Sequence, residues 1–351
     1  MIVHQFIANL EPGAVGAHTL LARRLLRDAG HASDIFTDLV APASEGDGAR
    51  PVRDYRGGAD VLVYQMAIGS FVADTLLAHR EPLVVNYHNL TPLRFLNGWD
   101  PAGTHGVAWG RAQLRDLAAR ATLGLAVSSY NEHELIEAGF ARTTVIPYLF
   151  DPGTTPRSSK HRRTGSTTWL FVGRLAANKA QHDIVKAFAA YRLLHDPDAE
   201  LRLVGGGVDE PYGRTLRRFV HALGLDDAVS LTGGVTPAGL GAHYAAADVL
   251  VVCSDHEGFC VPLLEAMHNS VPIVAYASAA VPETLGDAGL LLDVKDPYTI
   301  AEAVHHVVTD GRLRTHLIGA GHARLAEFSL ARTGAAFVDT VTAAAAVGTA
   351  R

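Results

Sequence analysis

The sequence predicts an α/β protein made of two consecutive, doubly wound, Rossmann-like parallel-sheet domains that face each other across a cleft. Short β-rich runs alternate with helix-like segments from end to end, and the 351 residues are too many for one ordinary core. One segment, 151–168, breaks the alternation because it is rich in Pro, Gly, Ser, Thr and basic residues. We therefore expect an N-terminal domain at 1–150, a linker at 151–168, a C-terminal domain at 169–330, and a terminal helix at 331–351 that packs back on the first domain.

Each strand is predicted from a short apolar run bounded by polar or glycine-containing residues. The expected strands are 2–7, 33–37, 60–64, 82–87 and 123–128 in the first domain, and 169–173, 200–205, 228–233, 248–253, 271–276 and 289–294 in the second. Helices are expected between them, and Ser129 and Glu132 have the spacing of a capping box that starts one. Because ligands bind beyond the carboxyl ends of parallel strands, the loops that follow the strands are where a site is expected.

Composition excludes several classes of protein. A hydrophobic content of 48% with 19% charged residues is typical of a soluble globular chain, and the net charge of −6 argues against nucleic acid as a partner. Two cysteines, Cys253 and Cys260, provide no disulfide framework. The N-terminus has no basic region followed by an apolar signal core, and no apolar run is long enough to span a bilayer. A cytoplasmic enzyme is the expected class.

The most informative motif is SDHEGFCVPLLEAM at 254–267, which places Glu257 and Glu265 after an apolar strand. Pro262 is expected to be the first helical residue, which leaves the backbone amides of 259–264 at the positive end of a helix. Such an end binds an anion, with phosphate the expected guest. Two flanking carboxylates could then accept hydrogen bonds from a phosphorylated, polyhydroxylated ligand such as a nucleotide sugar. The alternative is that both acids simply cap the helix.

Two cations follow the first strand of the second domain. Arg174 comes directly after the strand and Lys179 lies at the start of the next helix. At the carboxyl edge of the sheet they could neutralise a diphosphate, although they could equally be ordinary solvated charges of a loop.

Glycines follow two other strands. Gly205 and Gly206 leave room for a nucleotide base or ribose, and the cluster lacks the order of a dinucleotide-binding fingerprint. Gly13 and Gly16 would let the backbone approach a ligand closely, or would form a plain strand-to-helix turn.

Taken together, these motifs resemble a known family. EGFCVPLLEAM matches the Glu-x7-Glu signature of retaining GT-B glycosyltransferases, and with FVGRLAANKAQHDIVKAF, LVGGG and AADVLVVCSDHEGF the chain is similar to glycosyltransferase family four over most of 169–293. VNYHNLTPLRF and YQMAIGS look like segments of bacterial mannosyltransferases that build surface polysaccharides. The resemblance implies a metal-independent enzyme without a cofactor that transfers a hexose from a GDP- or UDP-sugar to a glycan, lipid-linked or small-molecule acceptor. Mannose from GDP-mannose is preferred, on the look of the first domain alone.

The resemblance also implies roles for single residues. Glu257 would bind the donor sugar's hydroxyls with the backbone amides of Phe259, Cys260 and Val261, and Glu265 would bind the ribose. Many relatives have glycine where this chain has Cys260.

Three further residues would act nearer the reacting bond. Arg174 and Lys179 would hold the diphosphate and stabilise its charge as the glycosidic bond breaks. His88 would lie close to the reacting sugar, with a structural histidine as the alternative. Many relatives have two adjacent glycines where this chain separates Gly13 from Gly16, which leaves the role of that loop open.

Other functions were weighed against transfer. A nucleotide-sugar epimerase or hydrolase would use the same fold, and a non-catalytic nucleotide-sugar-binding protein would bind the donor without turnover. A metal site on Cys253, His256 and Cys260 is disfavoured because structural zinc normally takes four ligands. Weak peripheral membrane contact through the arginines of one helix, Arg111, Arg115 and Arg120, is an alternative to a charged solvent face.

Overall fold

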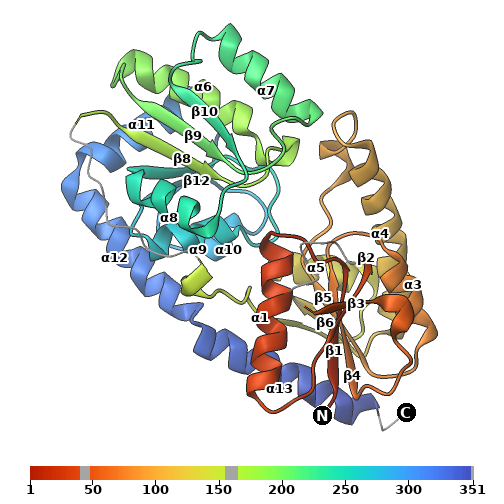
Figure 1. The fold of residues 1–351 in the computed structure, drawn as a ribbon. Helices are drawn as coiled ribbons and strands as arrows, with labels where there is room; N and C mark the ends of the chain where they lie inside the picture. The colour runs from red at the N-terminus through yellow and green to blue at the C-terminus, as the bar shows by residue number, and fades with distance from the viewer. Residues whose placement is uncertain (40–47, 155–164, 349–351) are drawn as a thin grey trace. The chain divides into compact units, whose positions relative to one another are not determined.

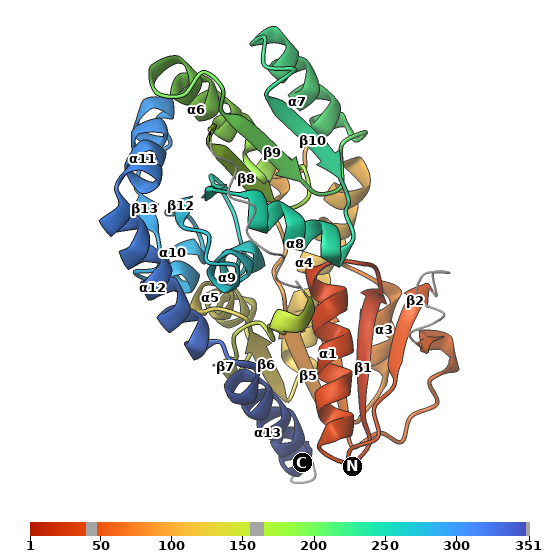
Figure 2. The ribbon, with the colours of Figure 1, turned by 60° about the vertical axis from the view of Figure 1, so that its left-hand side comes forward.

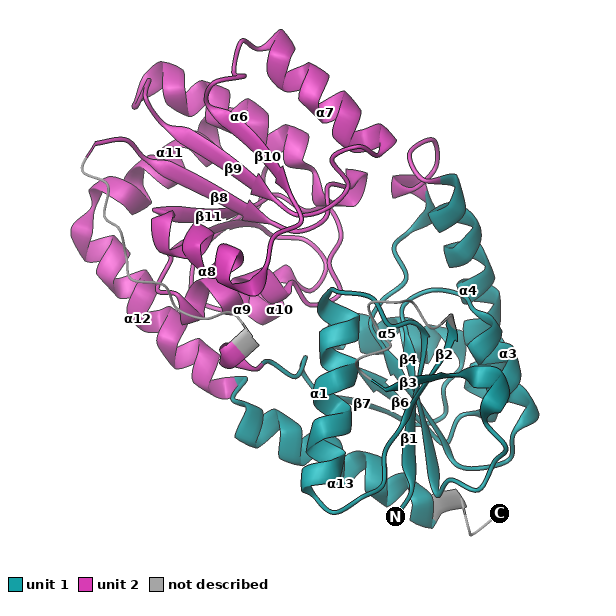
Figure 3. Ribbon diagram, viewed as in Figure 1, with its two compact units in different colours: residues 1–93, 101–150, 328–351 teal, residues 94–100, 151–327 magenta. Residues whose placement is uncertain are grey.

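The structure is a computed structural model of the chain that describes residues 1–39, 48–154 and 165–348 (Figure 1). It divides into two compact α/β units (Figure 3). Unit 1 consists of Met1–Leu93, Pro101–Phe150 and Phe328–Arg351, and unit 2 of Arg94–Asp100 and Asp151–Glu327. No pattern in the sequence indicated that the short segment Arg94–Asp100 would group with the second unit. Of the predicted linker, residues 155–164 lie outside the described part of the chain.

Unit 1 contains a parallel sheet in the order β3-β2-β1-β4-β5-β6-β7. Its strands are β1 (Val3–Asn9), β2 (Ile35–Leu39), β3 (Ala49–Pro51), β4 (Val61–Met66), β5 (Leu83–Tyr87), β6 (Leu123–Ala126) and β7 (Thr143–Val145). This is the strand order of a Rossmann fold, in which the direction of winding reverses between β1 and β4. The two edge strands β3 and β7 were not predicted, because three residues are too few to show a periodic pattern.

The helices of unit 1 are α1 (Ala14–Asp28), α3 (Phe71–Ala78), α4 (Pro101–Arg120), α5 (Ser129–Ala138) and α13 (Leu330–Gly348), with the short 3-10 turns η1 (Val52–Asp54) and η2 (Leu93–Phe95). α13 packs against α1, β4 and β5 (Figure 2). Its Phe337 and Val341 join Leu21 and Val63 in one buried apolar cluster. Burial of these large side chains stabilises the return of the last helix to unit 1. Residues 349–351 of the predicted terminal helix lie outside the described residues.

The helix predicted to start at Ser129 begins there, as α5, but its capping residue was predicted one position too late. The N-cap of α5 is Ser128, whose side chain accepts a hydrogen bond from the backbone N–H of Asn131. The predicted capping box of Ser129 and Glu132 is therefore shifted, because Ser128 is the serine with extended backbone that an N-cap needs.

Unit 2 repeats the same winding with the strand order β10-β9-β8-β11-β12-β13, all parallel. Its strands are β8 (Thr168–Val172), β9 (Glu200–Val204), β10 (Val229–Gly233), β11 (Val249–Val252), β12 (Ile273–Tyr276) and β13 (Leu290–Leu292). Its helices are α6 (Gln181–Leu194), α7 (Pro211–Ala222), α8 (Pro237–Ala246), α9 (Val261–His268), α10 (Val281–Leu285), α11 (Pro297–Thr309) and α12 (Gly311–Glu327), with the 3-10 turns η3 (Pro152–Thr154) and η4 (Ala177–Lys179).

The winding of unit 2 reverses between the neighbouring strands β8 and β11. Both strands are covered by helices, and Trp169, Leu170, Val249 and Val251 are fully buried. The loops that follow these two strands therefore start from buried central strands, at the switch point where ligands bind in such sheets.

Candidate active site

The loop between β11 and α9 places Glu257 at the switch point of unit 2. The Glu257 side chain is buried, and Lys179 Nζ lies 2.6 Å from its Oε2 while Ser254 Oγ donates to its Oε1 at 2.8 Å. Lys179 ends the η4 turn after β8, so two residues 78 positions apart meet because their strands are neighbours. The structure thus brings together two of the residues predicted as catalytic, as a partly buried ion pair.

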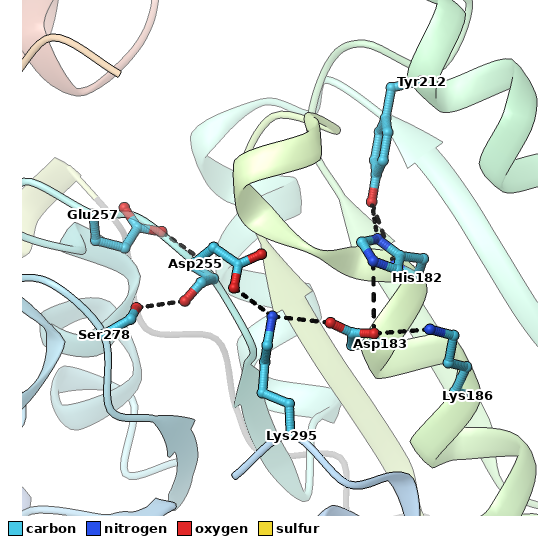
Figure 4. A network of polar contacts seen from close by, with 9 residues as sticks. His182, Asp183, Lys186, Tyr212, Asp255, Glu257, Ser278 and Lys295 are labelled. Carbon is cyan, nitrogen blue, oxygen red and sulfur yellow. Dashed lines mark hydrogen bonds and ion pairs between the residues drawn. The ribbon is translucent and has the colours of Figure 1, made fainter. Parts of the chain in front are cut away.

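A lysine from a third loop forms an ion pair with the loop that contains Glu257. Lys295, which follows β13, lies 2.6 Å from Asp255 Oδ1 and 3.0 Å from Asp183 Oδ2 (Figure 4). Burial alone would lower the pKa of Lys295, but its hydrogen bonds to Asp255 and Asp183 outweigh burial and raise the pKa. Ser278, after β12, donates its hydroxyl proton to the Ser254 carbonyl (Figure 4). The Glu257 loop is therefore tied to α6 and to the loops after β12 and β13, none of which its own sequence indicates.

The start of α9 differs from the prediction. The helix begins at Val261, so Pro262 is its second residue, and the N-cap is Cys260 with a left-handed backbone, φ 71° and ψ 63°. The amide of Leu263 donates to the Cys260 carbonyl at 3.0 Å, so it is not one of the unpaired amides that were expected over 259–264. The thiol of Cys260 is buried, and burial raises its pKa well above the usual range. Phe259 is buried and Val261 half-buried beside it.

Glu265 is the fifth residue of α9 and lies in its second turn, not in the first as expected. Tyr244 of α8 donates its hydroxyl proton to Glu265 Oε2 at 2.8 Å. Burial, followed by the charge of Glu265, raises the pKa of Tyr244 well above its usual range. Tyr244 therefore holds the carboxylate that the resemblance assigns to the ribose, and no local pattern pointed to it.

Arg174 follows β8 but contacts other carboxylates. Its guanidinium donates to Glu210 Oε2 at 2.7 Å and to Asp100 Oδ2 at 3.2 Å. Burial lowers the pKa of Arg174, and the two carboxylates more than offset this, so the pKa lies above its usual range. Arg174 and Lys179 thus lie in one loop region and have separate acidic partners.

The glycines of the β9–α7 loop have a structural reason to be small. A Cβ on Gly205 would lie 2.1 Å from the Gly173 carbonyl oxygen, and the amide of Leu175 donates to the Gly206 carbonyl at 2.8 Å. The loops after β8 and β9 are therefore in backbone contact. A Cβ on Gly206 would meet nothing within 4 Å, so this position is open.

In unit 1, His88 directly follows β5. Its backbone amide donates to the Met66 carbonyl at 2.8 Å, and its Nε2 lies 2.7 Å from Gln65 Oε1. Burial lowers the pKa of His88 to about 3, so the ring is neutral at physiological pH. Gln65 was not among the residues predicted for the site.

The other predicted residues of unit 1 lie at the start of α1. Gly13 is the N-cap with φ 152°, and a Cβ on Gly16 would lie 2.1 Å from the Glu11 carbonyl oxygen. Both positions therefore require glycine for the turn itself.

The structure bears on both the metal site and the membrane contact that the sequence left as alternatives. Across the described ranges, no group of three or more His, Cys, Asp or Glu side chains is placed to hold a metal ion. Arg111 donates to the Leu90 carbonyl, and Arg120 to the His79 and Glu81 carbonyls, so these arginines stabilise the backbone of unit 1. Arg115 is exposed. No helix in the described part of the chain is both long and apolar enough to cross a membrane.

Two Rossmann-like units define the GT-B class of protein, and solved structures agree. The chain is similar to HepE of Anabaena, solved with UDP-glucose, with a TM-score of 0.81 at 18% identity, covering 98% of this chain and 100% of that one. It is similar to sucrose-phosphate synthase of Thermosynechococcus elongatus with a TM-score of 0.78 at 19% identity, covering 95% and 96%. The predicted fold class is confirmed; that the two units face each other across a cleft stays a prediction.

Residues 154–324 match the family described as Glycosyl transferases group 1. The chain is 33% identical over 236 residues to the GDP-mannose-dependent alpha-(1-6)-phosphatidylinositol monomannoside mannosyltransferase of Mycobacterium tuberculosis, covering 60% of each chain. It is 35% identical over 222 residues to the D-inositol 3-phosphate glycosyltransferase of Geodermatophilus obscurus, covering 58% of this chain and 48% of the relative. The chain thus spans about half to three fifths of the length of these two relatives.

Proposed function

We propose that the protein is a retaining hexosyltransferase that moves mannose from GDP-mannose to an acceptor hydroxyl in glycan or glycoconjugate synthesis. The observation that carries the proposal is the Glu257–Lys179 pair at the switch point of a unit that matches the group 1 glycosyltransferases. The choice of mannose rests on the mannosyltransferase of Mycobacterium tuberculosis, a relative whose name states its donor. The inositol-containing acceptors in the names of the relatives suggest the acceptor class to test first.

The proposed division of labour follows from charge and burial. The ammonium group of Lys179 has three protons, of which one is engaged by Glu257, so two are available to oxygens of the diphosphate. Arg174 would add a second cation on the other side of the same loop. Glu257 would accept hydrogen bonds from sugar hydroxyls, and Glu265, held by Tyr244, would accept those of the ribose.

The proposed reaction is a same-face displacement that needs no metal. The bond between the anomeric carbon and the phosphate oxygen breaks, and its electron pair leaves with GDP. The acceptor oxygen bonds to the anomeric carbon on the face from which GDP departs, and the acceptor proton passes to the released phosphate oxygen. Lys179 and Arg174 would stabilise the negative charge that grows on the diphosphate, which is the kind of effect that contributes most to catalysis.

The test is a product assay across GDP-, UDP- and dTDP-linked mannose and glucose. Each donor is incubated with and without inositol phosphate and phosphatidylinositol mannoside, in buffer containing EDTA. Acceptor-dependent release of GDP, with an α-linked mannoside identified by NMR, is the expected result. Equal release without acceptor would indicate a hydrolase, conversion of the donor to an isomer an epimerase, and donor binding without turnover a binding protein.

A pair of variants tests the diphosphate contacts. Arg174→Ala with Lys179→Ala should weaken GDP binding by roughly 100-fold, since two charge-assisted contacts are lost. The matched control removes two exposed arginines of α7, Arg217 and Arg218, and should leave GDP affinity unchanged. Equal affinity in both double variants would remove the proposed diphosphate site.

A further inference from the structure

A chain of polar side chains crosses the core of unit 1 beneath His88. Gln5 of β1, Gln65 of β4, Asn86 of β5 and His18 of α1 are each no more than 2% exposed. Burying four polar side chains in the centre of a sheet is unfavourable unless they satisfy one another. The hydrogen bonds between them determine which atoms of this chain donate and which accept.

A backbone amide determines which partner donates in each hydrogen bond of these polar side chains. The N–H of Leu149 donates to His18 Nδ1 at 3.3 Å, and a backbone amide can only donate. Burial lowers the pKa of His18 well below its usual range, so the ring is neutral and has one proton. Because Nδ1 accepts, this proton is on Nε2, and His18 Nε2 must donate.

This fixed donor decides how two amides are turned. As placed, Asn86 Nδ2 faces His18 Nε2 at 3.0 Å, which would set two donors against each other. The oxygen and nitrogen of an amide are assigned from the hydrogen-bond network, so Asn86 presents Oδ1 to His18. The same atom of the Asn86 amide, now assigned as Oδ1, lies 2.9 Å from the nearest atom of the Gln65 amide. Gln65 must therefore donate to it from its NH2 group.

Exchanging the oxygen and nitrogen of the Asn86 amide requires the same exchange in the Gln65 amide, and this affects the other contacts of Gln65. One proton of its NH2 group goes to Asn86 and the other to His88 Nε2, which lies 2.7 Å from the same nitrogen. The other atom of the Gln65 amide is then Oε1, which accepts a hydrogen bond from the NH2 group of Gln5 at 2.7 Å. As placed, Gln5 Nε2 is buried with no partner among the described residues, and the exchange gives that NH2 group an acceptor. A buried carbonyl oxygen without a partner, which remains, is less costly than a buried NH2 group without one.

We propose that this chain fixes His88 as a neutral ring protonated on Nδ1, so that His88 acts as a hydrogen-bond donor and not as a base. Its Nε2 accepts from Gln65, while Nδ1 has no protein partner within the described ranges and the ring is partly exposed. Gln65, Asn86 and His18 are positioning residues for His88. The tautomer follows from unit 1 alone. That the Nδ1 proton is donated to an oxygen of the sugar donor rests on the proposed function.

The surroundings hold the two rings in place. The rings of His18 and His88 pack edge-to-face with centroids 4.7 Å apart, and Tyr148 packs on His18 at 5.1 Å. Tyr148 in turn donates to the Ala14 carbonyl in the first turn of α1. Burial, followed by the charge of His88, lowers the pKa of His18, so the two rings are also linked electrostatically.

The test is the protonation of each ring in the full-length protein. In protein labelled with 15N-histidine, long-range 1H–15N correlation distinguishes a protonated from an unprotonated ring nitrogen, and His88→Asn and His18→Asn assign the signals. His88 should be protonated on Nδ1 and His18 on Nε2, with both unchanged from about pH 6 to about pH 8. A His88 ring protonated on Nε2, or on both nitrogens, would overturn the proposal.

A variant of Gln65, one of the three positioning residues, adds a second measurement. Gln65→Glu keeps the shape but offers His88 only an acceptor, so the His88 proton should move to Nε2. The turnover number should fall by about tenfold or more, while GDP affinity is kept. Gln113→Glu is the control, because Gln113 is buried in the same unit and bonded instead to Ser70 and Asp74. An unaltered His88 tautomer in Gln65→Glu would refute the claim that Gln65 determines the tautomer of His88.

The two proposals fail separately. If no donor sugar is turned over, the proposed function is wrong, yet the 15N signals of the unmodified protein still decide the tautomer. If Gln65→Glu does not fold, the spectrum of the unmodified protein decides it alone.

Discussion

Replacing Glu257 with glutamine tests the central pair of unit 2 with the smallest change of shape. Glutamine keeps one accepting oxygen, which can take the hydrogen bond from Lys179, and its NH2 group can donate to the Ser254 hydroxyl oxygen at the other position. What is lost is the charge. A hydrogen bond to a charged group contributes about 1.5–3 kcal/mol and a neutral one about 1 kcal/mol, so the loss is roughly 0.5–2 kcal/mol. We take the lower half of that range, because the Lys179 side chain is 25% exposed and can be solvated.

The expected effects on stability and on catalysis differ in size. A loss of about 1 kcal/mol lowers the melting temperature of a domain of this length by roughly 2–4 °C. Transfer should fall far more, by about 100-fold to 1,000-fold, which is the usual cost of removing one preorganised polar contact to a transition state. GDP affinity should change little, since the proposed contact of Glu257 is to the sugar.

Initial rates of mannose transfer, GDP binding by calorimetry and thermal unfolding should be measured on the same preparations. Glu302→Gln is the matched control, because Glu302 is half-exposed and pairs with His195 on the surface of unit 2. Near-normal transfer by Glu257→Gln would refute the assigned role. A loss of transfer accompanied by an equal loss of GDP binding would place Glu257 at the nucleotide and not at the sugar.

Three further predictions follow from particular contacts. Cys260→Gly should leave the melting temperature within about 2 °C, because relief of the left-handed backbone, about 1 kcal/mol, offsets the loss of a small buried side chain; a large change in donor preference would show that the thiol shapes the sugar pocket. Lys295→Met should reduce transfer without weakening GDP binding, since it leaves Asp255 and Asp183 facing each other without their shared cation, and unchanged kinetics would contradict the support role. Denaturant unfolding should show that unit 1 loses roughly 1–2 kcal/mol through His88 on going from about pH 7 to about pH 5, and loses further stability through His18, because a folded-state pKa below the unfolded value gives stability that is lost as pH falls. A His88→Asn variant with an equally steep dependence would refute that assignment.

The central strands were predictable because the structure buries them on both faces. In sequence β11 is an unbroken apolar run and β4, β5 and β8 each contain a single polar residue, and each strand lies within two residues of its predicted bounds at both ends. The order in which they pair was implied only by the class of fold. The three-residue edge strands β3 and β7 could not be predicted, because their pairing depends on a neighbour supplied by the rest of the sheet.

The candidate site was predictable as a set of loops but not as a set of contacts. Strand ends in the sequence locate Glu257 and Lys179 correctly at one sheet edge, yet nothing in either segment indicates that the two side chains bond to each other. Lys295 and Tyr244 were missed for the same reason. Each acts on a residue that another loop or helix supplies, so neither has a local pattern to reveal it.

The start of α9 shows why a small shift in register changes the chemistry. The prediction assigned Pro262 to the first helical position, whereas the helix begins one residue earlier, at Val261. In the structure Cys260 is the N-cap and turns the chain through a left-handed conformation that side chains other than glycine rarely adopt. This conformation gives a physical reason why many relatives have glycine here, which the sequence could only note as a departure.

In both units, the side chain that is proposed to act on the donor sugar is held in a similar way. In unit 2, Glu257 at the end of β11 is held by Lys179 from beyond the adjacent strand β8. In unit 1, His88 at the end of β5 is held by Gln65 from the adjacent strand β4. Neighbouring strands are held in register by their backbones, so a partner on the next strand fixes a side chain more firmly than its own loop can. It follows that substitutions in these partners should reduce turnover more than they reduce stability, which separates a positioning role from a purely structural one.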